Sequence, residues 1–149
     1  MRIIGRREFV SLPLLGLAAI EAKIDTGAYT SSLHCENIKV NYENSKPILY
    51  FTIEQNMNAS GGPQTFRFEE FTTKKIKNSF GEMEERFVIK TFVHIGKKKI
   101  RSRISLSNRD SMRYPLLIGR RLIKGKFLVD VNNIHTGGIR ISKALHLLT

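Results

Sequence analysis

The stretch that decides the fold is Ala22-Lys23-Ile24-Asp25-Thr26-Gly27-Ala28-Tyr29-Thr30-Ser31-Ser32-Leu33. Its first residues alternate between apolar and polar side chains, which is the spacing of a β-strand. Gly27 interrupts this pattern, because glycine allows a sharp backbone turn that would be hindered at other residues. The stretch therefore predicts a strand that ends in a turn, with the carboxylate of Asp25 at its mouth and exposed backbone beside it. Such an arrangement suits chemistry better than packing.

The overall composition is that of an ordinary soluble globular protein. The chain has 149 residues, of which 41% are hydrophobic, so residues 1–149 are expected to form a single domain with its own core. Cys35 is the one cysteine, which excludes an intrachain disulfide and fits a reducing compartment such as the cytoplasm. The 25 basic residues outnumber the 13 acidic ones and give a net charge of +12. This balance indicates a polyanionic partner or an acidic substrate.

The N-terminal segment allows two interpretations. Arg6-Arg7-Glu8-Phe9-Val10-Ser11, followed by the largely apolar residues 12–20, is similar to a twin-arginine export signal. However, Pro13 and Gly16 are typical of a turn, and Glu21 ends the apolar run early. We favour a β-hairpin formed by residues 8–12 and 17–24. No segment is long enough to span a membrane.

Short strands separated by turn residues continue along the chain. Alternating patterns predict strands at residues 38–42, 48–53, 66–71, 87–95, 100–106 and 127–131. Turns are expected at 44–47 and 96–99, a hairpin at 75–84, one helical turn at 120–124 and a short closing element at 142–148. Because the chain has many short strands and no long amphipathic helix, the sequence predicts an all-β barrel or sandwich with at most one or two short helices.

Two common cofactor patterns are absent. Gly119 and Gly125 are separated by five residues where a phosphate-binding loop requires four, and Phe127 stands where Ser or Thr would hold magnesium. The four histidines and Cys35 lack the spacing of a zinc site. Cys35 is better explained as a small buried side chain. We therefore expect no cofactor and no metal.

Asp25 is the strongest catalytic candidate among the three aspartates. Asp110 lies between arginines, which indicates an ion-pair network, and Asp130 lies inside an apolar strand. Asp25 is the one followed by Thr-Gly, although such a turn can also be structural, with the carboxylate bonding local amides. A second segment, Leu117-Ile118-Gly119, makes the pattern more specific, because it is an apolar run that ends in glycine.

These segments together resemble the retropepsin-like aspartic peptidases, and in particular a bacterial group that carries the label ATP-dependent zinc protease. The resemblance covers most of the chain, namely residues 4–13, 22–34, 107–120 and 125–131 in this order. It implies a closed acid-protease barrel in which Asp25 is the catalytic acid. The residues support neither the zinc nor the ATP of the label.

The resemblance implies three further groups of site residues. The active-site loop that binds substrate would consist of Thr26, Gly27, Ala28 and Tyr29. The loop behind the site would consist of Leu117, Ile118, Gly119 and Arg120. A flap would cover the site over residues 75–86, with Ser79, Phe80 and Gly81 near its tip.

Two residues of the active-site loop bear on specificity and on pH. The bacterial group is expected to have arginine where this chain has Tyr29, so specificity is altered here if that arginine binds an acidic group of the substrate. Ala28 lacks the hydroxyl with which Ser or Thr could hydrogen-bond the carboxylate. We therefore expect a pH optimum nearer neutrality than that of strongly acidic enzymes.

A single Asp-Thr-Gly in the chain implies a homodimer. Aspartic peptidases use two carboxylates that share one proton, one activating a water and the other donating to the scissile carbonyl. A two-fold axis between two copies of Asp25 would supply this pair. Members of the group resemble partners of ATP-grasp ligases, which append acidic amino acids, so acidic peptide tails are one candidate substrate.

A different class of function also remains open. A catalytically inactive basic β-barrel could bind RNA, the ribosome or a protein partner. The charge supports this alternative, whereas no aromatic stacking motif accompanies it. Binding to RNA that depends steeply on salt and is unaffected by Asp25→Asn would favour it over the peptidase.

Overall fold

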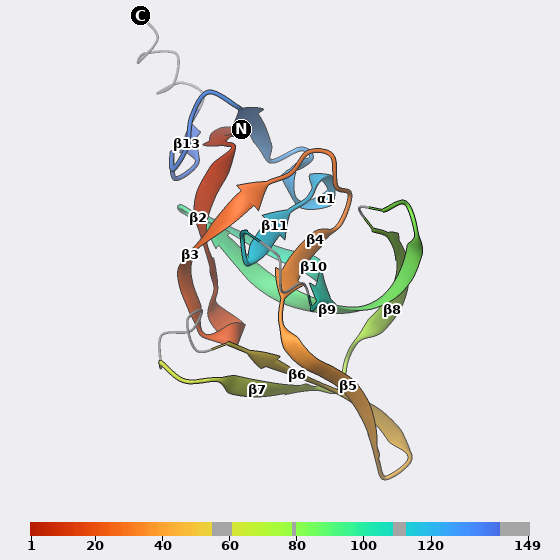
Figure 1. Ribbon diagram of the computed structural model, residues 1–149. Helices are drawn as coiled ribbons and strands as arrows, with labels where there is room; N and C mark the ends of the chain where they lie inside the picture. Colours follow the sequence, from red (N-terminus) through yellow and green to blue (C-terminus); the bar gives the residue numbers. More distant parts are fainter. Residues whose placement is uncertain (55–60, 79, 109–112, 141–149) are drawn as a thin grey trace, which may run out of the picture.

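The computed structural model describes residues 1–54, 61–78, 80–108 and 113–140, which are built almost wholly of β-strands (Figure 1). The strands are β1 (Arg2–Gly5), β2 (Arg7–Leu12), β3 (Leu17–Ile24), β4 (Ser31–His34), β5 (Glu36–Glu43), β6 (Lys46–Ile53), β7 (Gln64–Phe68), β8 (Thr72–Lys77), β9 (Met83–Ile95), β10 (Lys98–Ser107), β11 (Leu116–Ile118), β12 (Phe127–Asp130) and β13 (Ile139–Arg140). The helical segments of the described residues are η1 (Pro13–Leu15) and α1 (Arg120–Ile123). None of these is long and apolar enough to cross a bilayer.

Six strands close into a barrel, which confirms the predicted fold class. Hydrogen bonds join them in the order β10–β4–β11–β3–β2–β9, and β9 pairs with β10 to complete the ring. Alternate side chains of each strand point inward, so that Val10 and Leu12 of β2 and Val93 and Ile95 of β9 are fully buried. β8 pairs with β9 outside this ring and rises on one side of the barrel (Figure 1).

The predicted N-terminal hairpin is confirmed. β2 pairs antiparallel with β3, and η1 forms the turn between them. Gly16 ends this turn with φ 65°, a left-handed conformation that favours glycine. Leu12, Leu15 and Leu17 around the turn are buried, so the apolar run of the N-terminal segment belongs to the barrel core.

A three-stranded sheet of β12, β1 and β13 lies at one end of the molecule, close to the N-terminus (Figure 1). The buried carboxylate of Glu8 joins this sheet to the barrel. It accepts hydrogen bonds from Gly5 N at 2.7 Å, Thr136 N at 3.0 Å and Gly137 N at 2.9 Å. The backbones also approach closely, because a Cβ on Gly5 would lie 2.2 Å from the carbonyl oxygen of Asn133.

A second three-stranded sheet, β5–β6–β7, lies at the opposite end (Figure 1). Leu49, Phe51 and Ile53 of its central strand are fully buried and join the barrel core. The turn between β5 and β6 is tighter than predicted, because Asn44 and Ser45 both have positive φ, at 52° and 64°. β6 therefore begins at Lys46, within the residues expected to form the turn.

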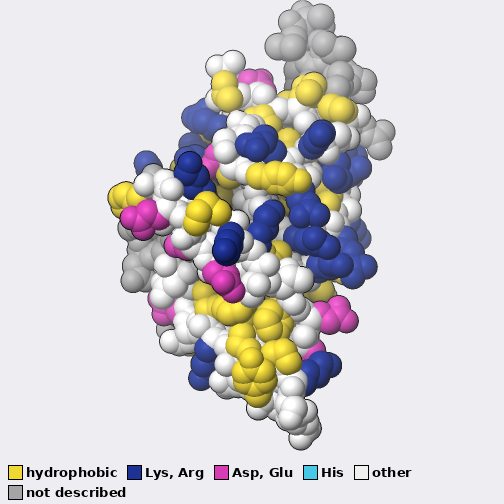
Figure 2. Space-filling view, turned by 90° about the vertical axis from the view of Figure 1, so that its right-hand side faces the viewer, with side chains coloured by type: hydrophobic (Ala, Val, Ile, Leu, Met, Phe, Trp, Pro, Cys, Tyr) yellow, Lys and Arg dark blue, Asp and Glu magenta, His cyan; other side chains and the backbone are white. Residues whose placement is uncertain are grey.

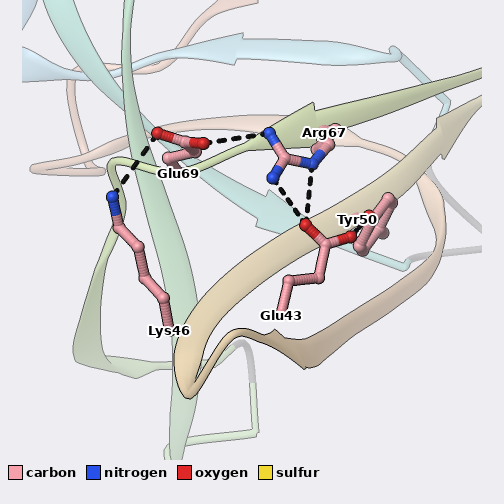
Figure 3. A network of polar contacts seen from close by, with 5 residues as sticks. All are labelled: Glu43, Lys46, Tyr50, Arg67 and Glu69. Atoms are coloured by element: carbon pink, nitrogen blue, oxygen red, sulfur yellow. Dashed lines mark hydrogen bonds and ion pairs between the residues drawn. The ribbon is translucent and has the colours of Figure 1, made fainter.

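A polar network ties the strands of the β5–β6–β7 sheet together (Figure 3). Arg67 donates to Glu43 and, at 3.1 Å, to Glu69, while Tyr50 bonds Glu43 and Lys46 lies 3.5 Å from Glu69. The hydrogen bonds from Arg67 lower the pKa of both carboxylates from the ordinary glutamate value. Because these groups are exposed, the network contributes to strand register more than to stability.

The remaining predicted elements are present in the described residues, with strand ends that differ from the prediction at several places, including β10, which begins at Lys98 inside the turn expected at 96–99. The predicted helical turn appears as α1, and the predicted hairpin at 75–84 appears as β8 and β9. The strand predicted at 66–71 ends at Phe68, because Glu69 bends out of the ladder toward Arg67 and Lys46. Asp110 and the closing element expected at 142–148 lie outside the described residues.

Candidate active site

The Asp25 loop is positioned by β11, which lies between β3 and β4. Leu116, Leu117 and Ile118 pair in parallel with residues 22–24 of β3, and β11 pairs antiparallel with β4 on its other side. The backbone N of Asp25 donates to the carbonyl oxygen of Ile118 at 2.9 Å. The predicted apolar segment therefore stands directly behind the predicted acid.

The loop itself holds the carboxylate of Asp25 through local hydrogen bonds. Gly27 N donates to Asp25 Oδ1 at 3.0 Å, and Ala28 N donates to the Asp25 carbonyl oxygen at 3.2 Å. Asp25 is half-buried, whereas Thr26 and Gly27 are exposed. One carboxylate oxygen is thus oriented by the backbone while the group remains accessible to a ligand.

Gly119 allows two backbone segments to come unusually close. A Cβ at this position would lie 2.7 Å from the carbonyl oxygen of Tyr29 and 2.8 Å from the carbonyl carbon of Thr30. Gly119 N also donates to Ser31 Oγ at 3.0 Å. Any side chain here would push the Asp25 loop away from β11, which gives a steric reason for the glycine at the end of the apolar segment.

The first turn of α1 also holds the Asp25 loop in place. Arg120 N donates to the carbonyl oxygen of Ala28 at 2.8 Å, and Arg121 N donates to that of Tyr29 at 3.0 Å. The guanidinium of Arg120 also donates from Nη1 to the carbonyl oxygen of Thr26 at 3.1 Å. The N-terminal amides of this turn, which have no partner within the helix, are therefore satisfied by the loop.

Tyr29 lies within reach of two cations from different elements. Lys74 Nζ of β8 lies 5.0 Å from the centre of the Tyr29 ring, and Arg120 Cζ lies 5.7 Å from it. These distances are those of cation–π contacts. Lys74 Nζ also donates to Thr30 Oγ1 at 3.3 Å. The Tyr29 ring therefore connects β8, a strand of the hairpin expected to form the flap, to the Asp25 loop.

The β8–β9 hairpin lies where the flap is predicted. Asn78 shapes its turn, because Asn78 Oδ1 accepts from Phe80 N and Glu82 N, each at 3.0 Å. Gly81 has φ 80° and the Phe80 side chain is 87% exposed. Ser79, the third predicted tip residue, lies outside the described residues. An exposed aromatic ring at a hairpin tip is available to contact a substrate or a second copy of the chain.

A cleft of about 750 Å³ separates the hairpin from the Asp25 loop. Its positively charged lining consists of Lys23, Lys74, Lys75, Lys77, Arg86 and Arg120. Among the described residues that line it, Asp25 is the one acid. Figure 2 faces the β8 side of the molecule and shows Lys and Arg side chains gathered over the upper and right-hand parts of this face. The cleft therefore has a strongly positive wall, which favours anionic ligands.

Several of these residues were not among the predicted site residues. Of the predicted site residues, Asp25, Gly27, Ala28, Tyr29, Leu117 and Arg120 line the cleft, and Ile118 and Gly119 are buried behind them, whereas Thr26, Phe80 and Gly81 are not part of the lining. Lys74, Arg86 and Ser32 were missed. Lys74 and Arg86 face each other across the β8–β9 ladder. The hairpin pattern in the sequence could suggest this pairing, and only the family resemblance indicated that the hairpin would cover the Asp25 loop.

Two other chemically active side chains have structural roles. Cys35 is fully buried, and burial raises the pKa of its thiol to about 12, which agrees with the predicted packing role. Asp130 accepts hydrogen bonds from Asn132 N at 3.0 Å and Asn133 Nδ2 at 2.7 Å, so it shapes the turn after β12. Among the residues that the structure describes, no three His, Cys, Asp or Glu side chains lie close enough to hold a metal ion.

A closed barrel whose Asp-Thr-Gly loop is backed by an apolar strand ending in glycine defines the retropepsin-like class. A family model described as "RimB-like: Retropepsin-like aspartic endopeptidase RimB" matches residues 3–136. The chain belongs to this family, as the sequence resemblance indicated.

The chain is also similar to part of several larger proteins. Proteins named "Probable alpha-L-glutamate ligase" from Shewanella halifaxensis and Shewanella pealeana are each 36% identical to it over 128 residues, which is 86% of this chain and 28% of theirs. The chain therefore spans little more than a quarter of the length of these relatives. A crystal structure of the Legionella pneumophila protein Lpg0085, of unknown function (DUF785), has a TM-score of 0.72 and 30% identity, covering 91% of this chain and 98% of the other.

Proposed function

We propose that this protein is a homodimeric aspartic peptidase that hydrolyses peptide bonds in acidic substrates. One observation carries the proposal: the accessible carboxylate of Asp25 opens into a cleft whose other charged lining residues, among those described, are all cationic. The family match supports the aspartic peptidase chemistry. The positive wall supports the acidic substrate, because it would attract negatively charged peptides.

The chemistry requires a second carboxylate, which we assign to Asp25 of a second copy of the chain. One carboxylate accepts a proton from a water as the water oxygen bonds to the scissile carbonyl carbon. The other carboxylate, protonated at the start, donates its proton to the carbonyl oxygen. The gem-diol intermediate then collapses as the C–N bond breaks: the amine nitrogen takes the proton that the first carboxylate received from the water, and one hydroxyl of the gem-diol returns its proton to the second carboxylate. Hydrolysis therefore needs the shared proton of the pair and no cofactor.

The named relatives suggest which acidic substrate to test. Proteins called probable alpha-L-glutamate ligases contain a region similar to this chain over about 28% of their length. We propose that the substrate is a peptide tail of α-linked glutamates and that the chain works beside an ATP-grasp ligase that appends them. The six cations of the cleft would pair with several such carboxylates at once.

The direct test is Asp25→Asn in the dimeric protein, assayed on an α-linked oligoglutamate peptide. Asparagine keeps the oxygen that accepts from Gly27 N, so the loop and the fold should be retained. We expect cleavage to fall by a factor of about 10³ or more, because the proton-sharing pair is lost. Glu70→Gln removes a negative charge at an exposed position outside the cleft and should leave cleavage unchanged. Full activity of Asp25→Asn would refute the proposal.

A second function is favoured by a separate basic groove of about 390 Å³ beside β10. Its cationic lining consists of Lys90, Arg101, Arg103, Arg121 and Lys126. This groove would suit a polyanion such as RNA, which is the non-catalytic alternative. Under that alternative, a double variant Arg101→Gln/Arg103→Gln weakens RNA binding and lowers its salt dependence, while Asp25→Asn leaves binding unchanged. Absence of salt-dependent RNA binding in the wild-type protein would exclude it.

A further inference from the structure

Two buried polar atoms in the wall of the active-site cleft have no hydrogen-bond partner. Among the side chains that the structure describes, the buried atoms without such a partner are Ser32 Oγ, Arg86 Nη2 and Thr91 Oγ1. Ser32 is 4% exposed and Arg86 is 7% exposed, and both line the cleft that contains Asp25. A buried polar atom without a partner is destabilising, so its retention in a ligand cleft suggests that a ligand supplies the partner.

Arg86 is paired with one acid, Glu84, and stands opposite a second cation. Its Nε donates to Glu84 Oε1 at 2.6 Å, and Nη2 contacts the same oxygen as an ion pair without a hydrogen bond. The side chain of Glu84 is 42% exposed and therefore shares its charge with solvent. Directly opposite Arg86 in the β8–β9 ladder stands another cation, Lys74. Side chains of such a pair lie on the same face of the hairpin, where like charges repel.

Ser32 supplies a hydroxyl from a rigid part of the site. It lies in β4, where its backbone pairs with Leu117 of β11 on one side and with Ser105 of β10 on the other. Pairing on both sides holds the Ser32 backbone in place, so its hydroxyl can move only by rotation about the Cα–Cβ bond. The hydroxyl can donate one hydrogen bond to a ligand, and the guanidinium of Arg86 can donate in the planar geometry that suits a carboxylate.

We propose that Arg86 and Ser32 form a subsite that binds a carboxylate of the substrate. This inference rests on the proposed peptidase function and identifies which residues of the cleft bind the acidic group of the substrate. The ligand is a carboxylate, because its two oxygens can accept hydrogen bonds from Arg86 Nη2 and Ser32 Oγ, which make none in the structure. Its negative charge, together with that of Glu84, would balance the cations Arg86 and Lys74. The carboxylate belongs to an acidic side chain or to the C-terminus of the peptide, and the two sources are separated by the choice of peptides below.

The test measures peptide binding to variants that also carry Asp25→Asn, because this substitution is expected to prevent cleavage of the peptide during the measurement. Isothermal titration compares three peptides of equal length: one with glutamates, one with glutamines at the same positions, and the glutamate peptide with an amidated C-terminus. We expect the parent to prefer glutamate over glutamine by about tenfold or more, and Arg86→Gln to remove most of this preference. Loss of binding on amidation alone would assign the subsite to the C-terminal carboxylate. Arg113→Gln, at an exposed position outside the cleft lining, should keep the parental preference.

Ser32→Ala is a second variant, which tests the subsite even if Arg86→Gln fails to fold. It removes a buried hydroxyl without a partner, so its melting temperature should be equal to or above that of the parent. The preference of Ser32→Ala for the glutamate peptide should be about threefold lower than that of the parent. Arg86→Lys keeps the charge without the planar guanidinium, so its preference should lie between those of Arg86→Gln and the parent. Unchanged preference in Ser32→Ala and Arg86→Lys would overturn the inference. Persistent cleavage by Asp25→Asn would instead refute the peptidase function and leave this binding result standing.

Discussion

Gly119 is the residue at which the fold and the site are most tightly coupled. We predict that Gly119→Ala lowers the free energy of unfolding by about 1–3 kcal/mol, because its Cβ would overlap the backbone of Tyr29 and Thr30. Urea unfolding followed by circular dichroism measures this change. Gly62→Ala is the matched control, since a Cβ at Gly62 meets no atom within 4 Å. Equal stability of the two variants would show that the Asp25 loop can move away from β11.

The buried thiol of Cys35 predicts that the protein loses stability at alkaline pH. Burial raises the pKa of its thiol to about 12 in the folded protein, compared with 9.0 for the ordinary group. Between these values the unfolded chain releases this proton while the folded chain keeps it, so stability is fully present below pH 9 and falls as the pH rises toward 12. The loss should approach about 1.4 kcal/mol per pH unit.

The comparison that isolates this contribution is between the wild-type protein and Cys35→Ala. Both proteins contain the same lysines and tyrosines, whose titration affects them equally. We expect the unfolding free energy of the wild-type protein to decline more steeply between pH 9 and pH 11 than that of Cys35→Ala. Parallel curves would mean that the folded thiol ionises at its ordinary pH. In the folded protein at pH 8, the same burial should also make the thiol unreactive toward alkylating reagents.

At the scale of elements, an aromatic contact joins the β8–β9 hairpin, the expected flap, to the Asp25 loop. We predict that Tyr29→Ala raises the KM for an acidic peptide by about threefold to tenfold, because Lys74 and Arg120 lose their shared ring and β8 is held less firmly over the loop. Faster amide exchange in β8 should accompany the change. Tyr29→Phe keeps the ring and should behave like the wild-type protein.

A control for this variant is available on another sheet. Tyr42 is 74% exposed on β5, away from the cleft, so Tyr42→Ala should change neither KM nor exchange in β8. Unaltered exchange in β8 of Tyr29→Ala would show that the ladder with β9 is enough to hold the flap. Tyr29 also differs from the arginine expected at this position. An arginine here would place a third cation beside Lys74 and Arg120 and would repel both.

At the scale of the whole molecule, the net charge of +12 acts on assembly and on substrate capture in opposite directions. Two copies of the chain repel one another, and salt screens this repulsion. We predict by analytical ultracentrifugation that the dimer becomes tighter between about 0.05 M and about 0.3 M salt, whereas kcat/KM for an acidic peptide decreases. A protein that is monomeric at all these concentrations yet fully active would contradict the shared-carboxylate mechanism.

Local sequence determined a large part of this protein. The N-terminal hairpin and the turn of the Asp-Thr-Gly loop carry local signals, so glycine positions and alternation were sufficient to predict that they exist, although β11 and α1 hold the loop in place. The apolar segment at Leu117–Gly119 was recognised in the same way. Strand ends were less predictable where side-chain contacts outweigh the pattern, as at Glu69, which leaves β7 to pair with Arg67 and Lys46.

Only the tertiary structure decided what surrounds Asp25. The β8–β9 hairpin is readable from sequence, but its placement over the loop brings Lys74 to Tyr29 and Arg86 to the cleft. Ser32 is one of several small polar residues in the chain, and the pairing of β4 with both β10 and β11 places it in the wall of the cleft, where its buried hydroxyl has no partner. These features depend on contacts between strands far apart in the sequence, because closing a barrel sets their register and no local pattern does.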